Sequence, residues 1–490
     1  MKNGRNATVV AVLLAALLAL VPLVGCASET AQTTGGEAAT TEATQTDTES
    51  EAPAEAEDQQ ADAAVPAETG AAYAAAWAPR EGYTLKQVVA MSRHNLRAPQ
   101  DKDMAELSRS TPHDWIAWSS NGSELTVKGG VAETIMGEFF RKWLESEGLV
   151  PENYIPEEGE VRFYANPRQR TLATTQFFSS GMLPVANVEI EYHGDYDSRD
   201  PTFKPRFGYV SDSYVEAATD SIAALGGDEG LAGIDADLQE SYDLIENVLD
   251  YKDSEVYQAG ETHDLTVGDA SYAIALDEEP AVSGSLKTAN KLSDALTLQY
   301  YEADDIADAS FGKDLSYDQW CQIAKVKNAY NDRRYATELV SVDCAHLLVS
   351  EIASELGKDG RRFSFLCGHD SNQSSLLHAL NVCDYDLPDT IETKTPIGGK
   401  ILFEVWENEA GEQFCNVRYV YATTEQVRNL ELLSLEQAPA SYDLDFDGIA
   451  RNDDGLFALE DVKGLLNDAL AAYDQLSVDY PEEVELDQAA

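Results

Sequence analysis

The sequence predicts an α/β domain with an inserted, mostly helical cap, and two patterns support this fold class. A strand-like apolar run at residues 83–91 is followed by helical spacing at 125–144, the first of several such alternations. Between about residues 202 and 327 the pattern changes, and segments such as 214–225 and 238–249 have the period of amphipathic helices. Alternating strands and helices are typical of a sheet covered by helices, so we interpret the helical stretch as an insertion into such a domain.

The alternation returns after the insertion and sets the expected domain boundaries. Further strand-like runs occupy residues 161–165, 362–367, 400–406 and 414–421. We expect residues 79–201 and 328–490 to form the α/β core and residues 202–327 to form the cap. With 490 residues and 43% hydrophobic composition, the chain is long enough to bury a large core.

The N-terminus has the features of an export signal. Lys2 and Arg5 precede an apolar run from Ala7 to Gly25, and Cys26 follows directly. The end of this run resembles the bacterial lipobox, in which the cysteine is lipidated. We expect residues 1–26 to be a lipoprotein signal peptide and Cys26 to anchor an extracytoplasmic protein in the cell membrane. An ordinary signal sequence or a short membrane helix is the alternative.

Residues 27–78 are predicted to form a disordered acidic linker. From Ala27 to about Ala75 the sequence consists largely of Ala, Glu, Thr, Gln, Gly and Asp, with almost no large apolar side chain. A segment of this composition cannot bury a core of its own.

The charge of the chain excludes one large class of function. There are 88 acidic residues against 34 basic ones, which gives a formal net charge of −54. Such a charge repels nucleic acids and anionic membrane surfaces, so we exclude nucleic-acid binding and expect membrane contact only through the N-terminal lipid. Against this background, a local cluster of arginines is more informative than in an average protein.

Neither the cysteines nor the aspartates indicate a metal site. Besides Cys26 the chain has five widely spaced cysteines without a CxxC pair or zinc-ligand spacing: Cys321, Cys344, Cys367, Cys383 and Cys415. Their odd number leaves at least one free thiol unless two chains pair, although a disulfide between Cys383 and Cys415 is conceivable. The stretch from Asp443 to Asp454 imitates a calcium loop but lacks its terminal Glu, and chance in so acidic a chain is the better explanation.

A first charged motif, Arg93-His94-Asn95-Leu96-Arg97, directly follows the strand-like run at 83–91. A guanidinium can donate two parallel hydrogen bonds to phosphoryl oxygens, and a neutral imidazole has a lone pair that can attack phosphorus. The motif therefore suits a site that holds a phosphate against a nucleophile. A basic loop that pairs with surface carboxylates is the alternative.

A second motif, Gly368-His369-Asp370, follows the strand-like run at 362–367. Loops at the carboxyl ends of strands in open α/β sheets converge on one ligand site, so we expect the two motifs to meet in space. Taken alone, His369 would be a buried core histidine and Asp370 a helix N-cap. The two motifs together favour a site.

Together these motifs resemble the two-part signature of the histidine acid phosphatases. The likeness extends from Glu81 to the C-terminal helix and is strongest to the glucose-1-phosphatase branch, which carries Asn at the position of Asn95, where most of the family has Gly. The resemblance implies a central mixed sheet flanked by helices. Segments that carry it include Gln169-Arg-Thr171, Leu296-Thr-Leu-Gln-Tyr-Tyr-Glu302 and Thr395-Pro-Ile-Gly-Gly-Lys400.

The resemblance also implies roles for individual residues. His94 matches the nucleophile and Asp370 the acid that protonates the leaving oxygen. Phosphate-binding positions are matched by His369 and by three arginines, Arg93, Arg97 and Arg170. Glu279 matches an acidic residue at the sugar end, although a surface carboxylate is the alternative there. Positive side chains can stabilise phosphoryl transfer by themselves, so we expect no metal or other cofactor.

The expected function is hydrolysis of a small phosphomonoester, with glucose 1-phosphate as the first choice. The alternatives are a phytase on the same scaffold and a lipoprotein that binds sugar phosphates without turnover. We expect an acidic rate optimum on the ground that Asp370 must start protonated. The sequence does not determine the oligomeric state.

Overall fold

The computed structural model describes residues 69–482, which fall within one structural unit, residues 61–490. The predicted signal peptide at 1–26, its Cys26 and most of the predicted linker lie outside the described residues.

The end of the predicted linker is corrected by the structure. Residues expected to belong to it form helix α1 (Thr69–Ala74) and the 3-10 turn η1 (Ala75–Trp77). Trp77 is only 2% exposed, and its ring packs edge-on against Phe139 and Trp143. The alanine-rich composition hides this anchor, because a single Trp supplies the buried surface that the segment otherwise lacks.

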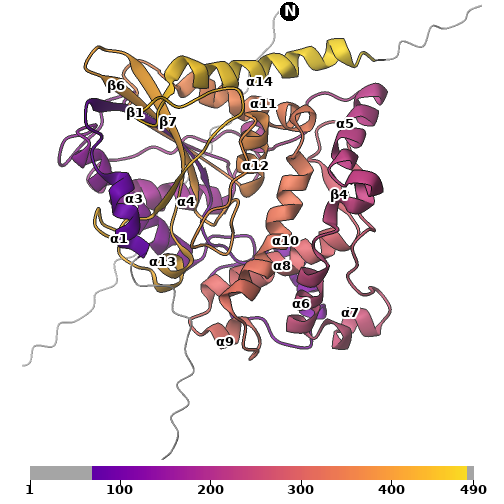
Figure 1. Ribbon diagram of the computed structural model, residues 1–490. Helices are drawn as coiled ribbons and strands as arrows, with labels where there is room; N and C mark the ends of the chain where they lie inside the picture. Colours follow the sequence, from indigo (N-terminus) through magenta and orange to yellow (C-terminus); the bar gives the residue numbers. More distant parts are fainter. Residues whose placement is uncertain (1–68, 483–490) are drawn as a thin grey trace, which may run out of the picture. The chain divides into compact units, whose positions relative to one another are not determined.

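Seven strands form a mixed sheet in the order β2-β5-β1-β6-β7-β8, with β9 beside β7 (Figure 1). The first three are parallel and the later pairings are antiparallel. In chain order the strands are β1 (Tyr83–Arg93), β2 (Val161–Ala165), β5 (Phe363–Gly368), β6 (Lys400–Asn408), β7 (Gln413–Tyr421), β8 (Ala440–Asp443) and β9 (Phe457–Ala458). The predicted α/β class with a central mixed sheet is confirmed.

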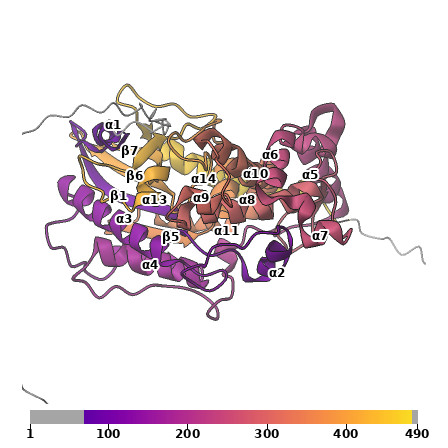
Figure 2. The same ribbon diagram turned by 90° about the horizontal axis from the view of Figure 1, so that it is seen from below.

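Helices cover both faces of this sheet (Figure 2). Val88 and Ala90 of β1 belong to the core that includes α3 (Val127–Ser146) and α4 (Gln169–Met182). Val89 and Met91 alternate with them and belong to the opposite core. That core is formed with α11 (Glu338–Glu355), α12 (Asp370–Ala379) and α14 (Leu459–Asp479). Alternate side chains of β1 therefore point to opposite faces of the sheet and belong to two different cores.

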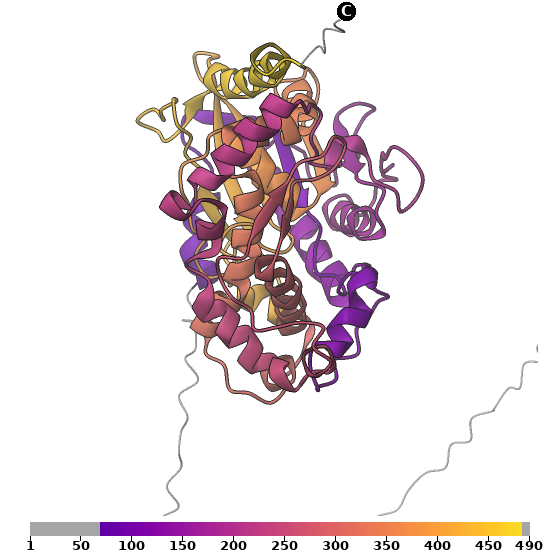
Figure 3. The same cartoon turned by 90° about the vertical axis from the view of Figure 1, so that its right-hand side faces the viewer.

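A helical region lies beside the sheet and has its own core (Figure 3). Its two longest helices, α8 (Ser285–Glu302) and α10 (Tyr317–Tyr335), pack against each other. The other elements of this region are η2 (Pro201–Phe203), α5 (Asp212–Ala224), η3 (Gly227–Asp235), α6 (Gln239–Leu249), η4 (Tyr251–Asp253), α7 (Glu255–Gln258), the β3 (Ser271–Ala273) and β4 (Ala281–Ser283) pair, and α9 (Ile306–Ala309). The proposed domain boundaries at 202 and 327 stay a prediction.

The sequence patterns locate the strands better than the helices. Each strand-like run lies within two residues of an observed strand. In contrast, α8, α10 and α11 are not among the predicted helices. The connecting helices α2 (Asp101–Arg109) and α13 (Thr424–Asn429) complete the described chain.

All five cysteines of the described part are free, so Cys383 and Cys415 do not form the conceivable disulfide. None of the described helices is both long and apolar enough to cross a bilayer.

Candidate active site

The two predicted motifs meet at one edge of the sheet. Strands β1 and β5 are parallel neighbours, and their register pairs Arg93 with Gly368. The next residues, His94 and His369, therefore leave the sheet side by side, with 5.4 Å between their ring centroids. Strand β2 ends at the same level, which brings Asn166 to the site.

Backbone and side-chain hydrogen bonds fix the orientation of His94. Its amide donates to the carbonyl of Gly368 (3.0 Å), and its Nδ1 lies 2.8 Å from the carbonyl oxygen of Asn95. A carbonyl only accepts hydrogen bonds, so we assign the proton of the neutral ring to Nδ1. The lone pair is then on Nε2.

The surroundings of His94 keep its imidazole neutral. Burial, followed by the positive charges of Arg170 and other groups of the site, lowers its pKa well below the ordinary value. A neutral imidazole is the form that can attack phosphorus.

Two of the three predicted arginines are paired with buried carboxylates. The Nη1 of Arg93 donates to Glu392 (2.8 Å) and also to the carbonyl of Thr395. The Nη2 of Arg97 donates to Asp294 (2.8 Å). The Nε of each arginine is buried and has no hydrogen-bond partner among the described residues.

The third arginine, Arg170, is different because no described carboxylate lies within ion-pair distance of it. It stands in the first turn of α4, and its Nη2 lies 3.4 Å from the Nδ1 of His369. Burial and the charge of Arg97 lower its pKa to about 9. A buried guanidinium without a carboxylate is the natural partner of an anionic ligand.

His369 is oriented by Asn166. The Oδ1 of Asn166 accepts from the amide of Asp200 (3.0 Å), so its Nδ2 faces the Nε2 of His369 (2.6 Å). An amide nitrogen donates, so Nε2 of His369 is the acceptor and the proton of the neutral ring lies on Nδ1. His369 thus offers a donor on the side of Arg170.

Asp370 is the first residue of α12, and basic groups surround it. Its Oδ1 accepts from the amide of Ser371 (2.9 Å), while its Oδ2 lies 3.4 Å from Lys327 and 3.9 Å from Arg93. Burial raises the pKa of Asp370, but Lys327, Arg93 and other positive groups lower it more, so the pKa lies well below its ordinary value. This low pKa favours the carboxylate form of Asp370, whereas the sequence led us to expect the protonated form.

Sequence reasoning missed three charged residues that line or support this site: Asp294 on α8, Lys327 on α10 and Glu392 in the loop before β6. Asp294 and Lys327 lie in amphipathic helices, where charged residues usually face solvent. No local signal distinguishes them from the other charges of an acidic chain.

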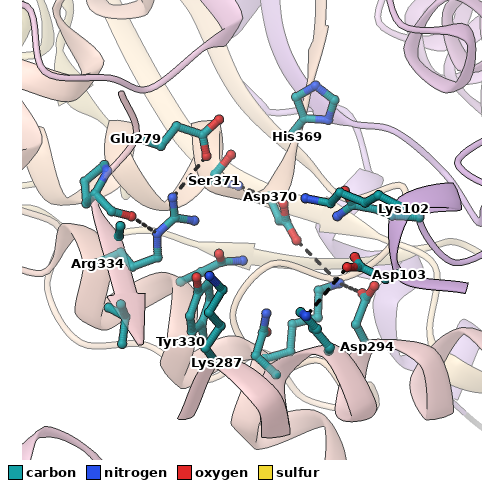
Figure 4. A pocket seen from close by; sticks show the side chains of 18 of the residues that line it. Lys102, Asp103, Glu279, Lys287, Asp294, Tyr330, Arg334, His369, Asp370 and Ser371 are labelled. Atoms are coloured by element: carbon teal, nitrogen blue, oxygen red, sulfur yellow. Dashed lines mark hydrogen bonds and ion pairs between the residues drawn. The ribbon is translucent and has the colours of Figure 1, made fainter. Parts of the chain in front are cut away.

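These side chains line a cavity of about 330 Å³, whose wall includes His94, Arg170, His369 and Asp370. In Figure 4, Asp370 lies between Glu279 with Arg334 on one side and Lys102 with Asp103 on the other. The cavity extends from the sheet edge to the helical region, so it can hold a phosphate at one end and the rest of the substrate at the other.

Glu279 lies in this cavity wall, in the connection between β3 and β4. It forms ion pairs with Arg199 and with Arg334, whose Nη2 lies 3.0 Å from its Oε2. It therefore lines the same cavity as His94 and Asp370.

The described residues contain no cluster of three His, Cys, Asp or Glu side chains that could hold a metal ion. This includes the aspartate-rich stretch that begins at Asp443, where Asp445 instead pairs with Arg451 (2.7 Å).

Comparisons with known proteins show the family of this chain. The sequence profile described as "Histidine phosphatase superfamily (branch 2)" matches residues 84–226. A glucose-1-phosphatase of Salmonella typhimurium is 36% identical over 79% of this chain and 93% of its own length, and one of Providencia rettgeri is 33% identical over 79% and 92%. The solved apo phytase of Hafnia alvei has a TM-score of 0.72 at 26% identity, over 81% of this chain and 99% of that chain.

The chain belongs to branch 2 of the histidine phosphatase superfamily, and it is a phosphatase of the histidine acid type. Within that family it is similar to glucose-1-phosphatases. The family resemblance stated from the sequence is confirmed.

Proposed function

We propose that this phosphatase hydrolyses phosphomonoesters through a phosphohistidine at His94 and prefers glucose 1-phosphate. One observation carries the proposal: a neutral, buried imidazole lies next to Arg170, a buried guanidinium that no described carboxylate neutralises. A phosphate supplies the missing negative charge and the phosphorus that His94 attacks.

In the first step, the Nε2 of His94 forms a bond to phosphorus while the bond from phosphorus to the leaving oxygen breaks. Arg93, Arg97, Arg170 and His369 hold the equatorial oxygens, where negative charge resides in the transition state. Asp370 gives its proton to the leaving oxygen, and the alcohol departs. General acid catalysis of this kind contributes roughly 10²–10⁴-fold.

In the second step, water attacks the phosphohistidine and the phosphorus–nitrogen bond breaks. Asp370, now a carboxylate, takes a proton from that water, and inorganic phosphate leaves. The departing phosphate takes this proton from Asp370, so His94 is again neutral and Asp370 again a carboxylate, and the cycle needs no metal and no other cofactor.

The proton that Asp370 donates arrives with the substrate. A phosphate monoester is a monoanion below its second pKa of about 6, and it brings one proton into a site where Asp370 is ionised. Once bound, the negative phosphate offsets the cations that depress the pKa of Asp370, so the proton can pass to the carboxylate.

Glucose 1-phosphate is favoured by the similarity to two glucose-1-phosphatases and by the far end of the cavity. There Glu279 is held between Arg199 and Arg334, which leaves fixed polar atoms for sugar hydroxyls. Glu279 is proposed to bind the sugar.

Phytate is the second candidate substrate, and one observation favours it. Lys102 and Lys287 line the cavity, and neither ammonium makes a hydrogen bond or ion pair with another described residue. Additional phosphates on the substrate would find partners there. The structural similarity to the Hafnia alvei phytase points in the same direction.

We further propose that the enzyme works outside the cytoplasm, tethered through a lipid on Cys26. This rests on the N-terminal sequence alone. In cells that express the full chain, the Cys26→Ala variant should fail to incorporate labelled fatty acid and should leave the membrane fraction. Unchanged labelling would contradict the tether.

The catalytic proposal is tested with purified protein and p-nitrophenyl phosphate. Wild type should hydrolyse it without added metal and form an acid-labile phosphoprotein, whereas His94→Ala should do neither. Full activity of His94→Ala would overturn the mechanism. The values of kcat/KM for glucose 1-phosphate, glucose 6-phosphate and phytate then rank the candidate substrates.

A further inference from the structure

Lys327 on α10 is surrounded by three carboxylates from three different segments. Its Nζ lies 3.1 Å from Oδ1 of Asp294, 3.2 Å from Oε1 of Glu392 and 3.4 Å from Oδ2 of Asp370. The side chain is 6% exposed. An ammonium group has three hydrogens to donate, and here three carboxylates surround it.

Lys327 joins two other buried ion pairs into one network. Arg97 pairs with Asp294 (2.8 Å) and Arg93 pairs with Glu392 (2.8 Å), so three cations face three carboxylates. Asp294 and Glu392 each have an arginine besides Lys327. The contacts of Asp370 are longer, with Lys327 the nearer cation at 3.4 Å and Arg93 at 3.9 Å.

Asp370 is also the most exposed carboxylate of the network, with 20% of its side chain accessible, against 15% for Asp294 and 0% for Glu392. It borders the cavity, so substrate can reach it. Its Oδ1 is held by the amide of Ser371, and Lys327 is the nearest charged group on its Oδ2.

We propose that Lys327 is the positioning residue of Asp370: it holds the carboxyl group at the cavity wall, in the orientation from which a proton passes to the leaving oxygen. The inference rests on the proposed function of Asp370 as the proton donor. It names a residue on α10, in the cavity wall next to Asp370, that acts on the chemistry through Asp370.

The electrostatic effect of Lys327 has the sign that this role requires. When the O–H bond of Asp370 breaks and the leaving oxygen gains the proton, a carboxylate forms next to the ammonium. Lys327 stabilises that carboxylate and so makes Asp370 a stronger acid in the transition state. Asp370 also interacts with Arg93, Arg97 and His94 of the first motif. Further charged or titratable groups that act on it come from other segments: Arg170, His369, Asp294 and Tyr419.

The leaving group provides the test, because p-nitrophenolate is weakly basic and needs little protonation, whereas a sugar alkoxide needs a general acid. Lys327→Met should reduce kcat on glucose 1-phosphate at least about tenfold more than on p-nitrophenyl phosphate. Asp370→Asn should show the same selectivity, and Lys327→Met should add little to it in the double variant. The exposed Lys325→Met, on the same helix, is the matched control and should behave as wild type.

Equal losses on both substrates, or full additivity with Asp370→Asn, would overturn the inference. If Lys327→Met does not fold, Lys327→Arg decides, since it keeps the charge and should keep the wild-type ratio of the two rates. A Lys327→Arg ratio as low as that of Asp370→Asn would likewise reject the role. A wild-type enzyme inactive on both substrates would instead reject the proposed function.

Discussion

The two halves of the phosphate site differ in charge balance. In the half formed by α8, α10 and the loop before β6, the cations Arg93, Arg97 and Lys327 face three carboxylates. In the half formed by α4, Arg170 has no carboxylate partner among residues 69–482. The balanced half can fix geometry without attracting anions, whereas the unbalanced half supplies the charge that draws the phosphate in.

The buried carboxylates of the molecule show the same contrast. Burial raises the pKa of Asp294, but Arg97 and Lys327 lower it more, so that it falls to about 2. Far from the site, burial raises the pKa of Asp343 to about 7, because only backbone amides and Tyr214 act against it. A cationic neighbour thus decides whether a buried carboxylate keeps its charge.

Removal of Arg170 should lower activity more than the substitutions proposed at Glu392 and Asp343. Arg170→Met should lower kcat/KM about 10²–10³-fold, because a positive donor to the phosphoryl oxygens is lost. It should also raise the pKa of His94, since Arg170 is the second-largest cause of its depression after burial. The acid limb of the pH–rate profile should therefore move to higher pH.

The matched control is Arg168→Met, at the residue before α4, where the arginine pairs with Asp197 (3.2 Å). It should retain nearly full activity. An Arg170→Met variant with more than a tenth of the wild-type kcat/KM would contradict the claim that Arg170 supplies the charge that attracts the phosphate.

Removing a negative charge from the balanced half should strengthen anion binding, which is the opposite of the effect expected for Arg170→Met. Glu392→Gln leaves Arg93 and Lys327 with less negative charge, so inorganic phosphate should inhibit the variant more strongly. The loss of a buried ion-pair partner should destabilise the protein by about 3 kcal/mol. Inhibition constants and thermal melts with and without phosphate measure both effects, and weaker inhibition by phosphate would contradict the expected sign.

The pH dependence of wild type follows from the two lowered pKa values. His94 stays neutral in acid because its pKa is well below the ordinary value, and the proton for Asp370 comes from the phosphate monoanion. With glucose 1-phosphate, kcat/KM should be highest at acidic pH and fall about tenfold per pH unit above about pH 6. A rate that rises steadily to about pH 9 would show that no proton is delivered in this way.

The smallest effect is expected at Asp343, the buried carboxylate without a cation. Its folded-state pKa lies above the unfolded value, so protonation stabilises the fold at low pH and this contribution is lost as the pH rises through about 7. Asp343→Asn should therefore raise Tm by about 2 °C relative to wild type at pH 8, but not at pH 5. Activity should not change, and an equal shift at both pH values would assign the effect to packing.

The sequence alone was enough to predict the strands β1, β2, β5, β6 and β7, the two motifs and the family. Val88, Val89, Ala90 and Met91 identify a strand with two buried faces, and the polar Arg93-His94 directly after it marks where that strand leaves the core. These signals are local: an apolar run and a change to polar residues can be recognised without knowledge of what packs against them.

The ion-pair partners of the site can be identified only from the three-dimensional structure. Asp294, Lys327 and Glu392 come from segments that are separated in sequence, and the fold brings all three next to Asp370 or the motif arginines. The lowered pKa of Asp370 follows from that arrangement, and nothing in the sequence alone indicated it. Charge interactions depend on distance and burial in three dimensions, and no periodicity along the chain records them.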